Sequence, residues 1–370
     1  MSKLKFLRAV CAASVSALMA FTATSANACT SFLLKAENGE FVYGRTMEFA
    51  LPLHSKLMVM PRNFTIQGVG PDGKDGSGLA FKTKYAATGM NGLDLPYFVD
   101  GMNEKGLNGG LLFFPQIAEF QDVSAADAAN SIASYQLLTY ILTQFATVDE
   151  VKAGLSKIKV NRAPLAAFNG TLPIHVTVHD ASGNSVAIEY VGGELNMIDN
   201  PTGVMTNAPG MQWHLDSLSM FATSTAAPVP PLVFNGKSFP QWSTGGGQVA
   251  QPGDYSSQSR FIRAAFLVNT APKFKDASEG MPIAFHLLNQ FDIPPGAIQT
   301  LAGGAAGGGV AGYEITEWAV SADLKNGIYQ FRTYDNPAIR QVSLKDLDLD
   351  AKEIRYISID QPAAATDLSK

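Results

Sequence analysis

The sequence predicts an α+β fold in which helices cover antiparallel sheets. Two observations support this fold class. Segments with strand character occur in groups, in the order strands, two helices, strands, helices, strands. Neighbouring strands are joined by short turns such as Asn38-Gly39 and Asn326-Gly327, and Asn-Gly is a strong signal for a tight hairpin between antiparallel strands.

Each element follows from its local pattern of apolar residues. Strands are predicted over residues 30–35, 40–47, 57–60, 79–87, 97–102, 107–114, 174–178, 185–191, 195–198, 314–321 and 328–334. Helices are predicted over 125–145, 147–158, 258–269 and 280–290. Thr147 and Glu150 form a capping box that opens the second of these helices. The segment 211–252 is irregular, and the glycine-rich 301–312, which lacks a phosphate-loop motif, is predicted to be a mobile loop.

The first 28 residues have the pattern of a secretory signal peptide. A basic start with Lys3, Lys5 and Arg8 precedes an apolar stretch from Ala9 to about Ala23, and Ala26-Asn27-Ala28 forms an A-x-A cleavage site. We therefore predict that residues 1–28 are removed and that 29–370 form a single mature domain. The protein would be exported, either periplasmic or secreted.

Composition limits the possible partners of the mature chain. Of the 27 Lys and Arg residues, three lie in the leader, so 24 basic residues would stand against 32 acidic ones, a net charge of −8. This charge disfavours nucleic acid or an anionic membrane surface as a partner. After leader removal no further stretch has the length and apolarity of a membrane span. Five histidines occur without an H-E-x-x-H pattern, so we predict no metal site and no cofactor.

Cleavage after Ala28 would leave Cys29 at the N-terminus, with a thiol and a free α-amine on one residue. A thiol is mostly protonated at neutral pH, whereas an α-amine has a pKa near 7.7–8.0 and supplies a base. The pair therefore resembles an N-terminal nucleophile, which needs no histidine. Two other interpretations remain at this point: the lipidated cysteine of a lipoprotein, or an ordinary buried cysteine. Cys11 lies in the leader, so the mature chain has one cysteine and no internal disulfide.

The predicted hairpin over residues 30–47 would bring Arg45 and Glu48 back beside Cys29. A guanidinium at that place would favour the thiolate electrostatically. Strand geometry alone also allows Arg45 to be a surface arginine.

Six short stretches together resemble the choloylglycine hydrolase and penicillin V acylase family of N-terminal-nucleophile hydrolases. They run in family order across nearly all of the mature chain. The stretches are Cys29-Thr30-Ser31-Phe32, Gly44-Arg45-Thr46-Met47-Glu48-Phe49, Met102-Asn103-Glu104-Lys105-Gly106-Leu107, Thr206-Asn207-Ala208-Pro209, Gly253 to Phe261, and Tyr334 to Arg340.

The resemblance implies an αββα sandwich of antiparallel sheets and hydrolysis of a linear amide. It implies that Cys29 is the nucleophile and that Arg45 lies beside the thiol. Asn207 corresponds to the asparagine that helps stabilise the oxyanion, and Arg260 to a second arginine of the site. Glu48 stands where the family usually has aspartate. The segment 211–252 matches an extended loop that many members use in tetramer assembly, so the resemblance also implies a homotetramer.

Bile-salt hydrolases commonly carry an asparagine where this chain has Phe113, which disfavours a preference for bile salts. Residues predicted to line an apolar acyl pocket are Met47, Met90, Leu93, Phe113 and Phe114. We therefore predict an exported amidohydrolase that acts on penicillin V, N-acyl homoserine lactones or conjugated bile salts, with the first two preferred. The alternative is a non-catalytic exported binding protein or lipoprotein that retains the fold. A papain-like protease would need a positioned histidine that no motif supplies.

Overall fold

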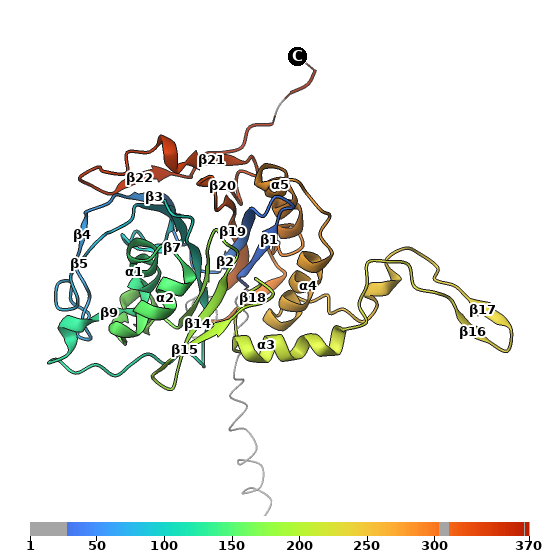
Figure 1. Ribbon diagram of the computed structural model, residues 1–370, viewed down its shortest axis with the longest axis horizontal. Helices are drawn as coiled ribbons and strands as arrows, with labels where there is room; N and C mark the ends of the chain where they lie inside the picture. Colours follow the sequence, from blue (N-terminus) through green and yellow to red (C-terminus); the bar gives the residue numbers. More distant parts are fainter. Residues whose placement is uncertain (1–27, 303–310, 366, 370) are drawn as a thin grey trace, which may run out of the picture.

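The protein is an αββα sandwich, seen in a computed structural model that describes residues 28–302, 311–365 and 367–369. Two antiparallel sheets face each other, with helices on the outer face of each (Figure 1). The predicted fold class is confirmed. The predicted leader up to Asn27 and residues 303–310 of the predicted mobile loop lie outside the described residues.

The first sheet carries the residues that follow Cys29. Within the described residues its strand order is β1-β2-β19-β20-β21, with β18 added on β19. The strands are β1 (Thr30–Lys35), β2 (Phe41–Phe49), β18 (Ile298–Thr300), β19 (Gly312–Asp323), β20 (Ile328–Thr333) and β21 (Arg340–Ser343). Almost every residue of β1 and β2 is buried because this sheet has helices on one face and the second sheet on the other.

The second sheet has the order β15-β14-β13-β8-β7-β6-β3-β22 among the described residues. Its strands are β3 (Lys56–Met60), β6 (Ala87–Asn91), β7 (Phe98–Asn103), β8 (Asn108–Phe113), β13 (Ile174–His179), β14 (Ser185–Val191), β15 (Glu194–Asp199) and β22 (Arg355–Ser358). Short pairs are formed by β4 (Thr65–Ile66) with β5 (Phe81–Lys82), β9 (Ser131–Ala133) with β10 (Lys159–Asn161), and β11 (Pro164–Leu165) with β12 (Gly170–Thr171).

Helices complete the outer layers. α4 (Ser257–Thr270) contacts β1 and α5 (Ala277–Leu288) contacts β2 and β19, whereas α1 (Leu137–Gln144) covers β7 and β8 of the other sheet. The predicted capping residue Thr147 does open α2 (Val148–Gly154), since its hydroxyl accepts a hydrogen bond from the Glu150 N–H. Within the described residues no helix is long and apolar enough to cross a membrane.

Two predicted elements differ from the structure. The helix predicted over 125–145 is confined to α1 at its end, because residues 131–133 form β9 and pair with β10. The strand predicted over 79–87 is only the two residues of β5 and the first residue of β6. Between them the backbone N–H groups of Lys84 and Tyr85 both donate to the Thr143 carbonyl, which interrupts the ladder.

The segment predicted to be irregular starts as α3 (Met211–Ser217) and then leaves the body of the molecule. We call residues 222–251 the arm. It contains the hairpin of β16 (Leu232–Phe234) and β17 (Lys237–Phe239), which projects far from both sheets (Figure 1).

Candidate active site

The β1–β2 hairpin places Cys29 among buried polar groups. Its register pairs Thr30 with Thr46 and Ser31 with Arg45, so the residue before the strand lies next to the end of β2. The Sγ atom of Cys29 is 3.5 Å from Sδ of Met47 and 3.8 Å from Nη2 of Arg45. Arg45 is fully buried. The alternative of a surface arginine is therefore wrong, because the second sheet covers this face of β2.

Asn207 and Arg260 approach Cys29 through its backbone. Oδ1 of Asn207 accepts hydrogen bonds from the Cys29 nitrogen at 2.9 Å and from Nη2 of Arg260 at 2.8 Å. Arg260 also donates to the Cys29 carbonyl and, at 2.8 Å, to Oγ1 of Thr30. The hydrogen bonds on both sides of the Asn207 amide fix its orientation. Two donors bind its Oδ1, and its Nδ2 donates to the Phe113 carbonyl at 2.8 Å. This amide therefore orients the nitrogen of Cys29.

Glu48 comes from the same strand as Arg45 but faces the other way along the pleat. It is fully buried, and Oε1 accepts a hydrogen bond from Thr316 at 2.9 Å. Burial raises the pKa of its carboxyl to about 8, while the positive charge of Arg260 acts in the opposite direction. Oε2 has no hydrogen-bond partner among the described residues.

The thiol is held in a dry environment. Burial raises the pKa of Cys29, and the charge of Arg45 and a hydrogen bond from the Glu48 backbone partly offset that rise. Only 1% of Cys29 is exposed. A thiol in these surroundings needs a nearby base to become a nucleophile at neutral pH.

The predicted pocket residues separate into two groups. Met47 contacts the thiol, and Phe113 lies in a cluster of three aromatic rings with Phe49 and Phe168, whose centroids are 5.7 to 6.0 Å apart. Met90 and Leu93 belong to the same hydrophobic cluster as Met47 and Phe113, whereas Phe114 is not part of it. Met90 is buried in the second sheet opposite Leu57, and Leu93 is a half-buried loop residue. The ring of Phe114 stacks on that of His175, with the two ring centroids 4.1 Å apart.

Sequence reasoning missed a buried network behind Arg45. Asp100, on β7 of the facing sheet, accepts hydrogen bonds from Arg45, Tyr43 and Tyr329. A signal was present, since Asp100 is an acidic residue inside an apolar predicted strand, where a charge needs a partner. Phe49 and Phe168 were missed because only the tertiary fold brings them to Phe113.

The chain is similar to known proteins over most of its length. A model of the linear amide C–N hydrolases, choloylglycine hydrolase family, matches residues 29–357. The bile salt hydrolase/transferase of Clostridium perfringens is 30% identical over 329 residues, covering 88% of this chain and 95% of its own. The penicillin V acylase of Pectobacterium atrosepticum is 25% identical over 362 residues, covering 92% and 86%. A mutant of the conjugated bile acid hydrolase from Clostridium perfringens has a TM-score of 0.79 at 27% identity, covering 92% of this chain and 99% of that chain.

The fold, the buried polar cluster and these similarities define an amidohydrolase that acts on linear C–N amide bonds. The chain belongs to the choloylglycine hydrolase family.

Proposed function

We propose that the chain is exported, that it is cut after Ala28, and that the freed Cys29 hydrolyses amides with its thiol as nucleophile and its α-amine as base. One observation supports this proposal: the two reactive atoms of Cys29, its sulfur and its nitrogen, are contacted by two different buried side chains. Arg45 reaches Sγ, and Asn207 accepts a hydrogen bond from the nitrogen. The family match also begins at Cys29.

The reaction follows from these two atoms. The neutral amine accepts the thiol proton, directly or through a water, and the thiolate forms a bond to the amide carbon. The carbonyl π electrons move onto oxygen to give a tetrahedral oxyanion. When the oxyanion collapses, the C–N bond breaks and the leaving nitrogen takes the proton from the ammonium group. Water then adds to the thioester carbon while the same amine accepts a proton from it, which gives a second tetrahedral oxyanion. When this oxyanion collapses, the C–S bond breaks, the acid product leaves, and the Cys29 thiolate takes the proton back from the ammonium group.

Asn207 is the proposed side-chain donor to the oxyanion. Its Nδ2 already donates to the Phe113 carbonyl, so an oxyanion contact would exchange that hydrogen bond for one to substrate. Oxyanion donors of this kind contribute roughly 3–4 kcal/mol elsewhere. Arg260 and Arg45 hold the nucleophile in place, and Glu48 is proposed to help orient the N-terminus.

The aromatic cluster of Phe49, Phe113 and Phe168 supports a preference for apolar or aromatic acyl groups. Each buried methylene of an acyl chain contributes about 0.8 kcal/mol, so such a surface discriminates strongly between acyl groups. We propose that penicillin V or long-chain N-acyl homoserine lactones are better substrates than conjugated bile salts. A bile-salt substrate is the second candidate, because the relative at 30% identity is named a bile salt hydrolase.

We expect kcat/KM on penicillin V or a long-chain N-acyl homoserine lactone to exceed that on glycine or taurine conjugates by at least about tenfold. Phe113→Asn should reduce this preference, because a polar amide in the ring cluster opposes an apolar acyl group. Phe113→Leu is the matched control, since it keeps the side chain apolar. A parent enzyme at least tenfold better on the bile-salt conjugates would establish the second candidate and leave the amidase assignment intact.

Intact mass of the purified protein separates this proposal from a non-catalytic binding protein or lipoprotein. A mass that begins at Cys29 with an unmodified thiol supports the amidase. A diacylglyceryl adduct or an uncut leader supports the alternative.

We also propose that the enzyme is a homotetramer joined through the arm. The arm exposes large apolar side chains, among them Leu232, Phe234 and Trp242 at 65%, 64% and 102% exposure. Apolar surface of this extent is typical of a protein–protein contact. An arm that projects from the body can reach a second copy of the chain (Figure 1).

Light scattering after size exclusion tests the arm directly. The parent should elute as a tetramer, and a variant with Leu232→Ser, Phe234→Ser and Trp242→Ser should elute as smaller species, because the apolar contact is removed. Tyr356→Ser, at an exposed apolar position on β22, is the control and should leave the mass unchanged. A monomeric parent at micromolar concentration would refute the assembly without affecting the chemistry.

A further inference from the structure

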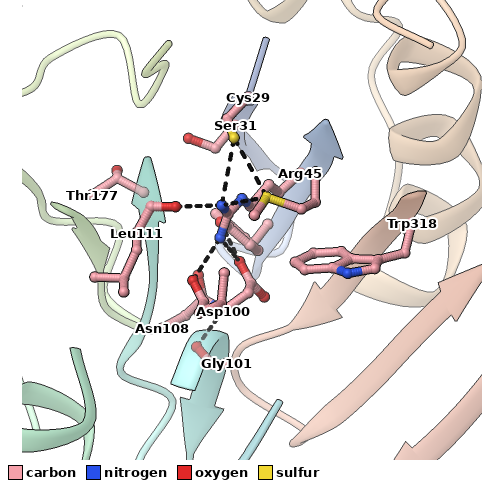
Figure 2. Close-up of polar contacts among 12 residues, drawn as sticks. Cys29, Ser31, Arg45, Asp100, Gly101, Asn108, Leu111, Thr177 and Trp318 are labelled. Atoms are coloured by element: carbon pink, nitrogen blue, oxygen red, sulfur yellow. Dashed lines mark hydrogen bonds and ion pairs between the residues drawn. The ribbon is translucent and has the colours of Figure 1, made fainter. Parts of the chain in front are cut away.

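Asp100 links the two sheets directly behind the thiol. Its Oδ2 accepts hydrogen bonds from Nη1 of Arg45 at 3.1 Å and from the Tyr43 hydroxyl at 2.8 Å. Its Oδ1 accepts one from the Tyr329 hydroxyl at 2.7 Å. All four side chains are fully buried. Figure 2 shows the carboxylate of Asp100 on one side of the guanidinium and the Cys29 sulfur on the other.

The guanidinium of Arg45 has little freedom in this position. Nη1 donates to the Val99 carbonyl at 2.8 Å as well as to Asp100, and Nη2 donates to the Leu111 carbonyl while facing Cys29. Gly110, opposite Asp100 in the sheet, leaves the space that Arg45 fills, because a Cβ there would lie 2.5 Å from Nη1. The centroid of the Trp318 ring lies 5.4 Å from the guanidinium carbon of Arg45.

We infer that Asp100 is a positioning residue for the nucleophile: it fixes Arg45 against Cys29 and neutralises part of the charge that the guanidinium offers to the sulfur. The inference deepens the proposed function and rests on it for its catalytic meaning. Asp100 itself does not touch the sulfur, and it acts only through Arg45.

The physical argument is a competition between two anions for one cation. In a dry site a carboxylate and a thiolate on opposite sides of a guanidinium each weaken the attraction of the other. If Asp100 were only structural, replacing it would change stability but would leave the ionisation of the thiol unaltered. The thiol is therefore the reporter that separates the two interpretations.

The other charged or titratable groups near Arg45, Asp100 and Cys29 come from β2, β20 and α4. Burial and the charge of Asp100 raise the pKa of Tyr43 and of Tyr329 well above the usual range, so both remain neutral donors near neutral pH. Arg260 lies on the backbone side of Cys29. Glu48 has a pKa raised to about 8 by burial, so it titrates within the useful range. The measurement is therefore made in a Glu48→Gln background.

The test is the rate of Cys29 alkylation by iodoacetamide between pH 6 and pH 9, read as the modified Cys29 peptide by mass spectrometry. Asp100→Asn keeps an oxygen for Arg45 but removes the charge. We expect the ratio of the alkylation rate at pH 6 to that at pH 9 to be about tenfold higher in this variant than in the parent, since the guanidinium then acts on the sulfur alone. Asp180→Asn is the control. It makes the same change at a buried turn aspartate that accepts hydrogen bonds from Ser182 and Asn184, and its ratio of alkylation rates should stay within about twofold of that of the parent.

A second variant removes the same charge in another way. Asp100→Ser keeps an oxygen that can accept from Arg45 but has no carboxylate, so the ratio of the alkylation rate at pH 6 to that at pH 9 should again rise by about tenfold. This variant tests the inference if Asp100→Asn does not fold. An unchanged or lower ratio in a folded Asp100→Asn or Asp100→Ser overturns the inference. Alkylation requires no turnover, so failure of the proposed function would be seen separately, as absence of hydrolysis of penicillin V, N-acyl homoserine lactones and conjugated bile salts.

Discussion

Replacing Cys29 by alanine will abolish turnover of penicillin V, N-acyl homoserine lactones and conjugated bile salts while the chain stays folded. Nucleophile and base are proposed to sit on this residue, and removing the nucleophile of a hydrolase costs about 10⁴-fold or more. The backbone contacts of Cys29 to Asn207 and Arg260 do not involve the sulfur, so alanine can keep them. Activity is measured with purified protein, and folding by circular dichroism and thermal unfolding.

The control for this change is Cys29→Ser, which keeps the α-amine and a hydroxyl of similar size. The serine hydroxyl is a much weaker nucleophile than the thiol, although the α-amine base is intact. The activity of Cys29→Ser should therefore be far below that of the parent but not below that of the alanine variant. Appreciable turnover by folded Cys29→Ala, with contamination excluded, would remove Cys29 from the mechanism.

A single residue left before Cys29 will also inactivate the enzyme. An amide nitrogen is no base, and a positioned general base contributes about 10²–10⁴-fold to such reactions. Two leaderless chains that differ by one alanine test this: one begins at Cys29 and the other at Ala28 once the initiator methionine is removed, with both ends verified by mass. We expect the Ala28 form to lose about 10²–10⁴-fold in kcat/KM.

The structure explains why this comparison concerns chemistry and not folding. Ala28 is fully buried and packs with Ile293 and Ile298, so the extended chain has a place for the extra residue. The nitrogen of Cys29 donates to Asn207 with Ala28 attached. Equal activity of the two verified forms would show that the α-amine is not the base, and the role of Cys29 as nucleophile would then need another proton acceptor.

Local signals predicted the parts of the fold where they face little competition. The Asn38-Gly39 turn allowed β1 and β2 to be paired, and Thr147 marked the start of α2. They failed where a distant segment competes for the hydrogen bonds of the backbone. Residues 131–133 are such a place, since they pair with β10 as a strand and limit the predicted helix to α1.

The same distinction holds within the site. Cys29 and Arg45 could be placed together from sequence because one hairpin connects them, and Asn207 and Arg260 followed from the resemblance. Asp100 could not be assigned, because its partner lies on the opposite sheet and contact between sheets leaves no fixed spacing in a chain. Phe168 was missed for the same reason, since it reaches Phe113 from a short 3-10 helix over residues 166–168 that is far from Phe113 in the sequence.

By itself the sequence determined the fold class, the family and the identity of the residue on which the proposed chemistry depends. These depend on turn residues, periodicity and short motifs, which are local properties of the chain. Only the tertiary structure decided what surrounds that residue: the carboxylate that shares Arg45, the donors on Asn207 and the ring cluster beside Phe113. These depend on packing between sheets, where residues far apart in sequence exclude water together and charges must find partners.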